Sequence, residues 1–337
     1  MTRSRDERRP ARSRQLVVGG TGVGPGERRR IEIAIARLPP ADSVLSIPVE
    51  VLRGETDGPS VWISAGIHGD ELNGVEIVRR LLRKVAVSNL RGTLFAVPVV
   101  NAFGFVHQDR YLPERRDLNR AFPGSRTGSL ASRLARIFMD EIVRHCEVGV
   151  DLHTGSDHRS NWPQIRADLS DGETRRLALA FGAPIAIDAT TRDGSLRDAA
   201  TRQGARVLLY EAGEPQRFHP GAIRTGVAGC LRVLRTLGML IEPAEGSTDA
   251  SAATPTLVAT RSAWVRARRG GLCRLRVRLG DHVERGHRLA TISDIFGVRN
   301  VRVTASTAGI VIGLAQNPLV REGDAIAHLA TELETSR

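Results

Sequence analysis

The stretch that decides the fold is "VWISAGIHGDELNGVEIVRRLL", residues 61–82. Its first part is an apolar run typical of a buried strand, and its second part repeats apolar residues at helical spacing. Between the two stand His68 and Glu71, which offer an imidazole and a carboxylate three positions apart, and both groups are zinc ligands. A second interpretation needs no metal: a solvated turn leads into a helix, and Asp70 and Glu71 favour the positive end of its dipole. The rest of the chain has to decide between them.

The composition is that of a globular protein with an excess of arginine. The 337 residues suffice for one large domain and a smaller one, and 41% are hydrophobic. No apolar run approaches the roughly 18 residues of a membrane span. The net charge of +12 comes from arginines spread along the chain, with Lys84 as the single lysine and only 4% aromatic residues, which argues against a nucleic-acid surface. Three isolated cysteines without C-x-x-C spacing are typical of a reducing compartment, so we expect a cytoplasmic protein.

The order of apolar patterns predicts an α/β fold. Residues 31–53 alternate like a pair of strands, and strands then alternate with amphipathic helices. This order predicts a mainly parallel or mixed sheet with helices on both faces. The expected strands are 60–66, 93–100, 148–152 and 205–210, and the expected helices are 71–86, 129–145, 173–182 and 220–239.

The chain divides into four expected segments. Residues 1–25 form a basic tail that we expect to be disordered, and residues 26–242 form the α/β domain. Residues 243–256, rich in Ala, Ser, Thr, Pro and Gly, form a linker. Residues 257–337 hold short strands, and "VRLGDHVERGHRLATIS" is echoed there by "NPLVREGDAIAHLAT". Two similar halves with a Gly-Asp turn in each predict a small all-β barrel or sandwich.

Polar residues follow four of the expected strands. His68 and Glu71 follow the first, Asn101 the second, His153 the third and Glu211 the fourth. The carboxyl ends of parallel strands meet at the same edge of the sheet, so these residues should lie near one another. Each residue alone also has a structural explanation, such as a buried histidine or a turn-forming asparagine. Together they meet the needs of a hydrolytic zinc: protein ligands, an open position and a carboxylate nearby.

An arginine-bearing loop, "DRYLPERRDLNRAFPGS" at residues 109–125, borders the same edge. Arginine binds carboxylates through two hydrogen bonds and can polarise a carbonyl group. Arg115 and Arg116 also fit a solvated basic loop. Asn119 and Arg120 are the stronger candidates for a site, because the Pro and Gly that follow fix where the segment turns.

Four motifs in order, "HGDELNG", "RYLPERRDLNRAFPGS", "DLHTG" and "YEAGE", resemble the succinylglutamate desuccinylase and aspartoacylase family. The resemblance covers residues from about 31 to 335. Members of that family are zinc deacylases on the carboxypeptidase A type of α/β fold. The resemblance therefore implies one Zn²⁺ per chain, bound by His68, Glu71 and His153.

The same resemblance implies roles for four further residues. Glu211 would be the general base that activates the attacking water and then protonates the departing amine. Arg110 would stabilise the oxyanion, and Asn119 and Arg120 would hold a substrate carboxylate. Glu214 has the chemistry of a rival base, but the motif favours Glu211.

The C-terminal segment resembles the biotinyl and lipoyl type of barrel. Residues 257–337 contain no lysine, which excludes the attachment of a swinging cofactor. Such a segment would shield the active-site mouth, limit substrate size or mediate assembly, and a homo-oligomer is compatible with it.

The leading hypothesis is a zinc amidohydrolase that cleaves the amide of a small N-acyl amino acid. One alternative keeps the chemistry and takes short peptides, with Asn119 and Arg120 at the C-terminal carboxylate. Another is a non-catalytic binding module that has kept the fold. Because both histidines must be neutral to bind metal, activity should fall below about pH 6.

Overall fold

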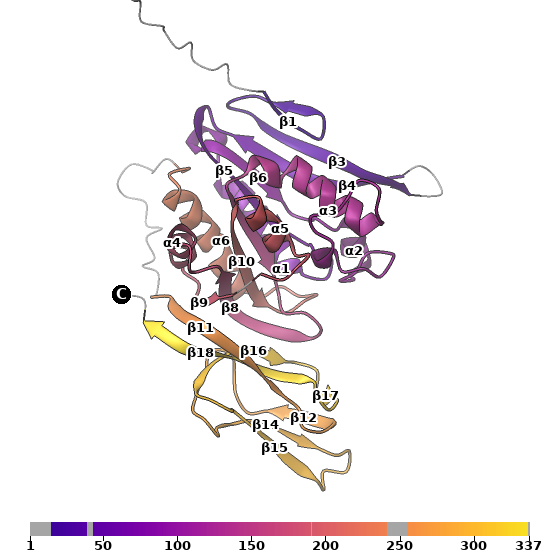
Figure 1. The fold of residues 1–337 in the computed structure, drawn as a ribbon, viewed down its shortest axis with the longest axis vertical. Helices are drawn as coiled ribbons and strands as arrows, with labels where there is room; N and C mark the ends of the chain where they lie inside the picture. Colours follow the sequence, from indigo (N-terminus) through magenta and orange to yellow (C-terminus); the bar gives the residue numbers. More distant parts are fainter. Residues whose placement is uncertain (1–14, 39–42, 190, 241–254, 336–337) are drawn as a thin grey trace, which may run out of the picture.

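A computed structural model describes residues 15–38, 43–189, 191–240 and 255–335 (Figure 1). A twelve-stranded mixed sheet runs through both parts of the chain. In spatial order its strands are β13 (His282–Val283), β16 (Gly309–Ala315), β18 (Ala325–Thr335), β11 (Leu257–Arg266), β9 (Ile185–Asp188), β8 (Arg159–Ala167), β10 (Arg206–Gly213), β7 (Val148–His153), β5 (Thr56–Ala65), β6 (Arg91–Val97), β4 (Ser43–Arg53) and β3 (Arg28–Leu38).

The centre of this sheet is parallel, and its flanks are mostly antiparallel. Strands β6, β5, β7 and β10 pair in parallel, as do β8 with β9 and β9 with β11. The expected mixed α/β architecture with helices on both faces is confirmed. One face packs against α1 (Leu72–Lys84), α4 (Gly172–Phe181) and α6 (Pro220–Thr236), and the other against α2 (Ala102–His107), α3 (Leu130–Glu141) and α5 (Leu196–Arg202).

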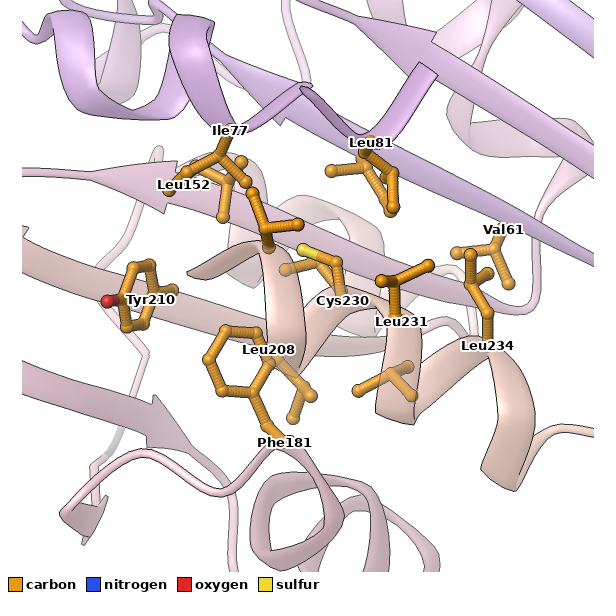
Figure 2. Close-up of a cluster of buried hydrophobic side chains, with 14 of the residues drawn as sticks. Val61, Ile77, Leu81, Leu152, Phe181, Leu208, Tyr210, Cys230, Leu231 and Leu234 are labelled. Atoms are coloured by element: carbon orange, nitrogen blue, oxygen red, sulfur yellow. The ribbon is translucent and has the colours of Figure 1, made fainter. Parts of the chain in front are cut away.

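Strand β5 shows why the opening stretch is an uninterrupted apolar run. Val61 and Ile63 point into the core under α1 and α6, while Trp62 points into the core on the opposite face. A strand buried on both faces has no polar alternation. Figure 2 shows the first of these cores, to which α1 contributes Ile77 and Leu81 and α6 contributes Leu231.

The C-terminal β part shares strands with the α/β part. Strand β8 pairs with β9 along one stretch and with β16 along another, so β16, β18, β11, β9 and β8 close a ring. A second sheet completes this barrel-like part, with the order β15 (Asn300–Thr304), β14 (Arg288–Ser293), β12 (Gly271–Leu275) and β17 (Leu319–Val320). The two parts are therefore joined by continuous hydrogen bonding.

The internal repeat of the C-terminal part forms two equivalent turns. Gly280 and Gly323 adopt φ angles of +88° and +87°, in the left-handed region that favours glycine. In each turn the following aspartate accepts a hydrogen bond at 2.7 Å from the backbone nitrogen three residues before it, Arg278 in the first and Arg321 in the second. The repeated Gly-Asp pairs thus mark the same local structure.

The expectation of a disordered tail over residues 1–25 is wrong from Leu16 onward. Residues 1–14 lie outside the described residues, but β1 (Leu16–Val18) and β2 (Thr21–Val23) form an antiparallel hairpin. Val18 and Val23 are fully buried against the core beside α3. The expectation of disorder rested on the basic residues that precede this segment, and it overlooked two short apolar strands.

The expected linker lies mostly outside the described residues, through residue 254. At its end, Thr256 is buried and donates a hydrogen bond from Oγ1 to the carbonyl of Ala183 at 2.8 Å. No helix in the described parts of the chain is long and apolar enough to cross a membrane.

Candidate metal centre and active site

His68, Glu71 and His153 come together at the carboxyl ends of β5 and β7. His68 lies in the turn after β5, Glu71 immediately precedes α1, and His153 is the last residue of β7. One ligand atom from each lies within 4.8 Å of the others. All three side chains are buried, with exposures of 4%, 2% and 5%. The alternative of a solvated turn before α1 is therefore wrong, and these residues could hold a metal ion.

Close packing of α1 on the sheet places Glu71. A Cβ atom at Gly74 would lie 2.8 Å from the Cβ atoms of both Ala65 and Leu152, so a glycine is needed for the helix to lie this near. The Glu71 carboxylate makes no cap hydrogen bond to its own helix. Instead it accepts one from the backbone nitrogen of Thr154 at 3.0 Å, which turns it toward the end of β7.

Each histidine faces Glu71 with one ring nitrogen and an outer carboxylate with the other. Nδ1 of His68 lies 2.8 Å from Glu71, and Nδ1 of His153 lies 2.9 Å from it. Nε2 of His68 lies 3.2 Å from Asp117, and Nε2 of His153 lies 2.8 Å from Asp151. An outer carboxylate that accepts a hydrogen bond from Nε2–H leaves the Nδ1 lone pair directed inward, which is the usual arrangement of metal-binding histidines. The donor set thus fits a divalent ion.

The electrostatics of the centre favour charged groups in the metal-free chain. Burial lowers the pKa of His153, but Asp151 and Glu71 raise that pKa well above its ordinary value of 6.5. Burial likewise lowers the pKa of His68, and Glu71 and Asp117 raise it above the ordinary value. Burial raises the pKa of Glu71, but the two imidazoles outweigh it and hold that pKa far below 4.5.

Arg110 lies directly beside this centre. Its Nη2 donates to Asp117 at 2.9 Å, and its Nη1 donates to Glu71 at 3.4 Å. The guanidinium group is therefore fixed by two carboxylates, and it lines the same cavity as the three candidate ligands.

Glu211 lies across from His153, its register partner in the parallel pair of β10 and β7. The amide nitrogen Nδ2 of Asn161 donates to Oε2 of Glu211 at 2.5 Å. The rival carboxylate, Glu214, points elsewhere: it lies 3.0 Å from Arg217 and 3.7 Å from His219. Glu211 lines the cavity at the metal centre, and Glu214 does not.

The two expected carboxylate-binding residues occupy different environments. Oδ1 of Asn119 accepts a hydrogen bond from the backbone nitrogen of Leu196 at 2.9 Å and so ties the loop to the start of α5. Arg120 is exposed, and both residues line the cavity. Asn101 does not line it, because its Oδ1 accepts a hydrogen bond from the backbone nitrogen of Gly104 at 2.9 Å and caps α2.

The cavity has a volume of about 350 Å³ and is bordered by both parts of the chain. The C-terminal part contributes Trp264 and His328, whose rings stack 4.2 Å apart, and the guanidinium of Arg159 lies 5.5 Å from the Trp264 ring. Burial and the nearby arginines Arg166 and Arg159 lower the pKa of His328 to about 3, so it is neutral at ordinary pH. Seven arginines line the cavity against three carboxylates: Arg110, Arg120, Arg159, Arg166, Arg192, Arg197 and Arg266, with Glu71, Asp151 and Glu211.

Several of these residues were not expected from the sequence. Asp151 had a usable signal, since it precedes His153 by two positions and so lies on the same face of β7. Asp117 stands in the loop already singled out for its arginines. No local sequence pattern indicates that Asn161 and Trp264 line the cavity, because only the pairing of distant strands brings them there.

The fold and the site define an α/β protein with a buried His-Glu-His centre at its strand ends. A family model for the succinylglutamate desuccinylase/aspartoacylase catalytic domain matches residues 57–237. Over 318 residues the chain is 30% identical to N-alpha-acetyl-L-2,4-diaminobutyric acid deacetylase of Halomonas elongata, across 90% of this chain and 91% of that protein. The chain belongs to the succinylglutamate desuccinylase/aspartoacylase family, which confirms the resemblance seen in the motifs.

Two further relatives support this assignment. A succinylglutamate desuccinylase of Pseudomonas aeruginosa is 32% identical over 122 residues, which cover 32% of this chain and 35% of that protein. The crystal structure of a succinylglutamate desuccinylase/aspartoacylase from Rhodobacter sphaeroides matches with a TM-score of 0.80 at 26% identity, covering 92% of this chain and 96% of that one.

Proposed function

We propose that this protein is a zinc-dependent deacylase that hydrolyses the amide bond of a small N-acyl amino acid. One observation carries the proposal: the buried cluster of His68, Glu71 and His153 shares a cavity with the carboxylate of Glu211. The carboxypeptidase A type of zinc hydrolase has this combination of a mixed sheet and strand-end ligands, and we infer that arrangement here.

Zinc suits the donor set, because imidazole nitrogen and carboxylate oxygen are both common zinc ligands. When bound, it would supply Lewis acidity to the amide carbonyl and to the attacking water. The outer carboxylates Asp117 and Asp151 keep both histidines oriented for it.

The remaining chemistry falls to the chain itself. Glu211 takes the proton of the attacking water and delivers it to the departing nitrogen. Arg110 stabilises the negative charge that develops on the carbonyl oxygen, since Asp117 and Glu71 already fix its guanidinium beside the centre. Asn119, through its amide nitrogen, and Arg120 hold the substrate carboxylate.

The substrate is small and anionic. The excess of arginine over carboxylate in the cavity favours negative charge, and the walls from the C-terminal part suit a small acylated metabolite better than a peptide. Relatives described as a deacetylase and as a desuccinylase support an acyl group that is short.

Mass spectrometry of the zinc-loaded protein with a panel of N-acetyl and N-succinyl amino acids tests this function. We expect one member to be hydrolysed to its acid and amine by the wild-type chain and to remain intact with the Glu211→Gln variant. Cleavage of short peptides with a free C-terminus, without hydrolysis of any N-acyl amino acid in the panel, would instead establish the peptide alternative.

A further inference from the structure

Asn161 lies at the junction between the catalytic sheet and the C-terminal part. It belongs to β8, where its register partner is Gly213 on β10 and Gly313 on β16. Its side chain is buried, with 8% exposure. A polar side chain between two glycines, buried next to the candidate base, calls for an explanation that strand formation does not supply.

The amide of Asn161 contacts Glu211 with its nitrogen and borders β16 with its oxygen. Its Nδ2 donates to Glu211, and its Oδ1 faces β16, where a Cβ atom at Gly313 would lie only 3.1 Å away. The same Cβ atom would lie 3.2 Å from Cβ of His328, which stacks on Trp264. Gly313 of the C-terminal part therefore leaves room for the amide in its present position, and a side chain there would press on Oδ1.

The irregular backbone pairing of β10 at Glu211 makes the hydrogen bond from Asn161 important for orienting the Glu211 carboxylate. The pairing of β10 with β8 is irregular between Glu211 and Gly213, so Glu211 stands at a break in the ladder. The hydrogen bond from Asn161 holds Oε2 and so restricts the orientation of the carboxylate, while Oε1 is left for proton transfer. Base catalysis depends on that orientation.

We propose that Asn161 is a positioning residue for Glu211, and that β16 of the C-terminal part maintains it through the absence of a side chain at Gly313. The inference rests on the proposed role of Glu211 as general base. It gives the C-terminal part a function in catalysis itself, in addition to bordering the cavity.

The first test replaces the amide with an apolar group of similar size. Asn161→Leu should lower kcat about 10- to 100-fold and leave KM within about twofold, because the substrate is still bound while the base is poorly oriented. Zinc content should stay at the wild-type level. A higher KM with an unchanged kcat would show that Asn161 binds the substrate instead, and would overturn the inference.

The second test acts from the C-terminal side without altering Asn161. Gly313→Ala should push the amide by a few tenths of an ångström and lower kcat by roughly threefold to tenfold. Val311→Ala is the matched control on the same strand, because it removes buried volume from the C-terminal core and leaves the amide alone. Equal kcat values for the two variants would overturn the proposed link to β16.

Two further readouts separate this inference from the proposed function. If Glu211→Gln keeps full activity, the base assignment itself is wrong; if it is inactive while Asn161→Leu is fully active, only the positioning role is wrong. A crystal structure of Asn161→Leu decides independently of any substrate. We expect the Glu211 carboxylate to be displaced or to occupy several positions there, and an unchanged carboxylate would overturn the inference.

Discussion

At the scale of single residues, the candidate metal centre depends on the carboxylates behind its histidines. Asp151 is 1% exposed and is itself held by the hydroxyl of Ser64, which donates to its Oδ1 at 2.8 Å. A series of hydrogen bonds therefore runs from Ser64 through Asp151 to His153, and it fixes the imidazole before any metal binds.

The Asp151→Asn substitution tests the role of these hydrogen bonds. Because the Ser64 hydroxyl donates to Oδ1, the asparagine turns its NH₂ group toward Nε2 of His153. That group can only donate, so it favours the tautomer with the proton on the inward nitrogen. We expect zinc affinity to fall about 10- to 100-fold, measured by competition with a chromophoric chelator. Asp171→Asn, at the partly buried N-cap of α4, should leave the affinity unchanged. An unaltered affinity in Asp151→Asn would contradict the proposed orientation of His153.

The raised histidine pKa values predict how zinc binding depends on pH. In the metal-free chain His153 and His68 keep their protons above pH 6.5, so zinc has to displace them and its affinity falls as the pH is lowered through that region. Without metal, the charged histidines stabilise the fold below pH 6.5, and this contribution is lost as the pH rises through the raised pKa values. Calorimetric titration in buffers of different ionisation enthalpy should show net proton release. An affinity that is constant between pH 6 and pH 8 would contradict the account.

At the scale of secondary-structure elements, the position of α1 couples packing to the site. Gly74→Ala forces α1 away from Ala65 and Leu152 and carries Glu71 with it. The free energy of unfolding should fall by about 1–3 kcal/mol, and zinc affinity should fall as well. Gly221→Ala in α6, where a Cβ atom meets nothing within 4 Å, is the control and should be neutral or stabilising by about 0.4–1 kcal/mol. Chemical denaturation of both variants gives the comparison, and equal stability would refute the close-packing argument.

The helices and strands that could be predicted from the sequence are those in which a regular pattern of apolar residues continues over many positions. The segment from β5 through α1 and the strand β7 that ends in His153 follow from such patterns, as does the placing of His68 and Glu71 at the sheet edge. Strand β8 was missed because its buried polar residues find their partners on distant strands: Gln164 donates to the carbonyl of Ile312, and Asn161 to Glu211. Strand β9, with four residues, is too short to show a period.

At the scale of the whole molecule, the two parts of the chain share a core. Ile187 of β9 packs with Ala259 of β11, Ile312 of β16 and Ala330 of β18 inside the ring of strands. The sequence pattern predicts a separate barrel, because pairing between β8 and β16 joins residues about 150 positions apart and leaves no local signal.

Such a shared core predicts cooperative unfolding. Calorimetry and urea denaturation should each show one transition for the whole chain, and Ile312→Ala should move that transition as a unit. Two separate transitions, only one of which is shifted by Ile312→Ala, would show that the C-terminal part folds independently.

The central claim is that Glu211 performs proton transfer beside a metal bound by His68, Glu71 and His153. Its most direct test measures zinc content and turnover together in the Glu211→Gln variant, with the substrate found for the wild type. We predict one zinc per chain, as in the wild type, and a loss of turnover of at least about 100-fold. A variant that keeps both its zinc and its full activity would contradict the account.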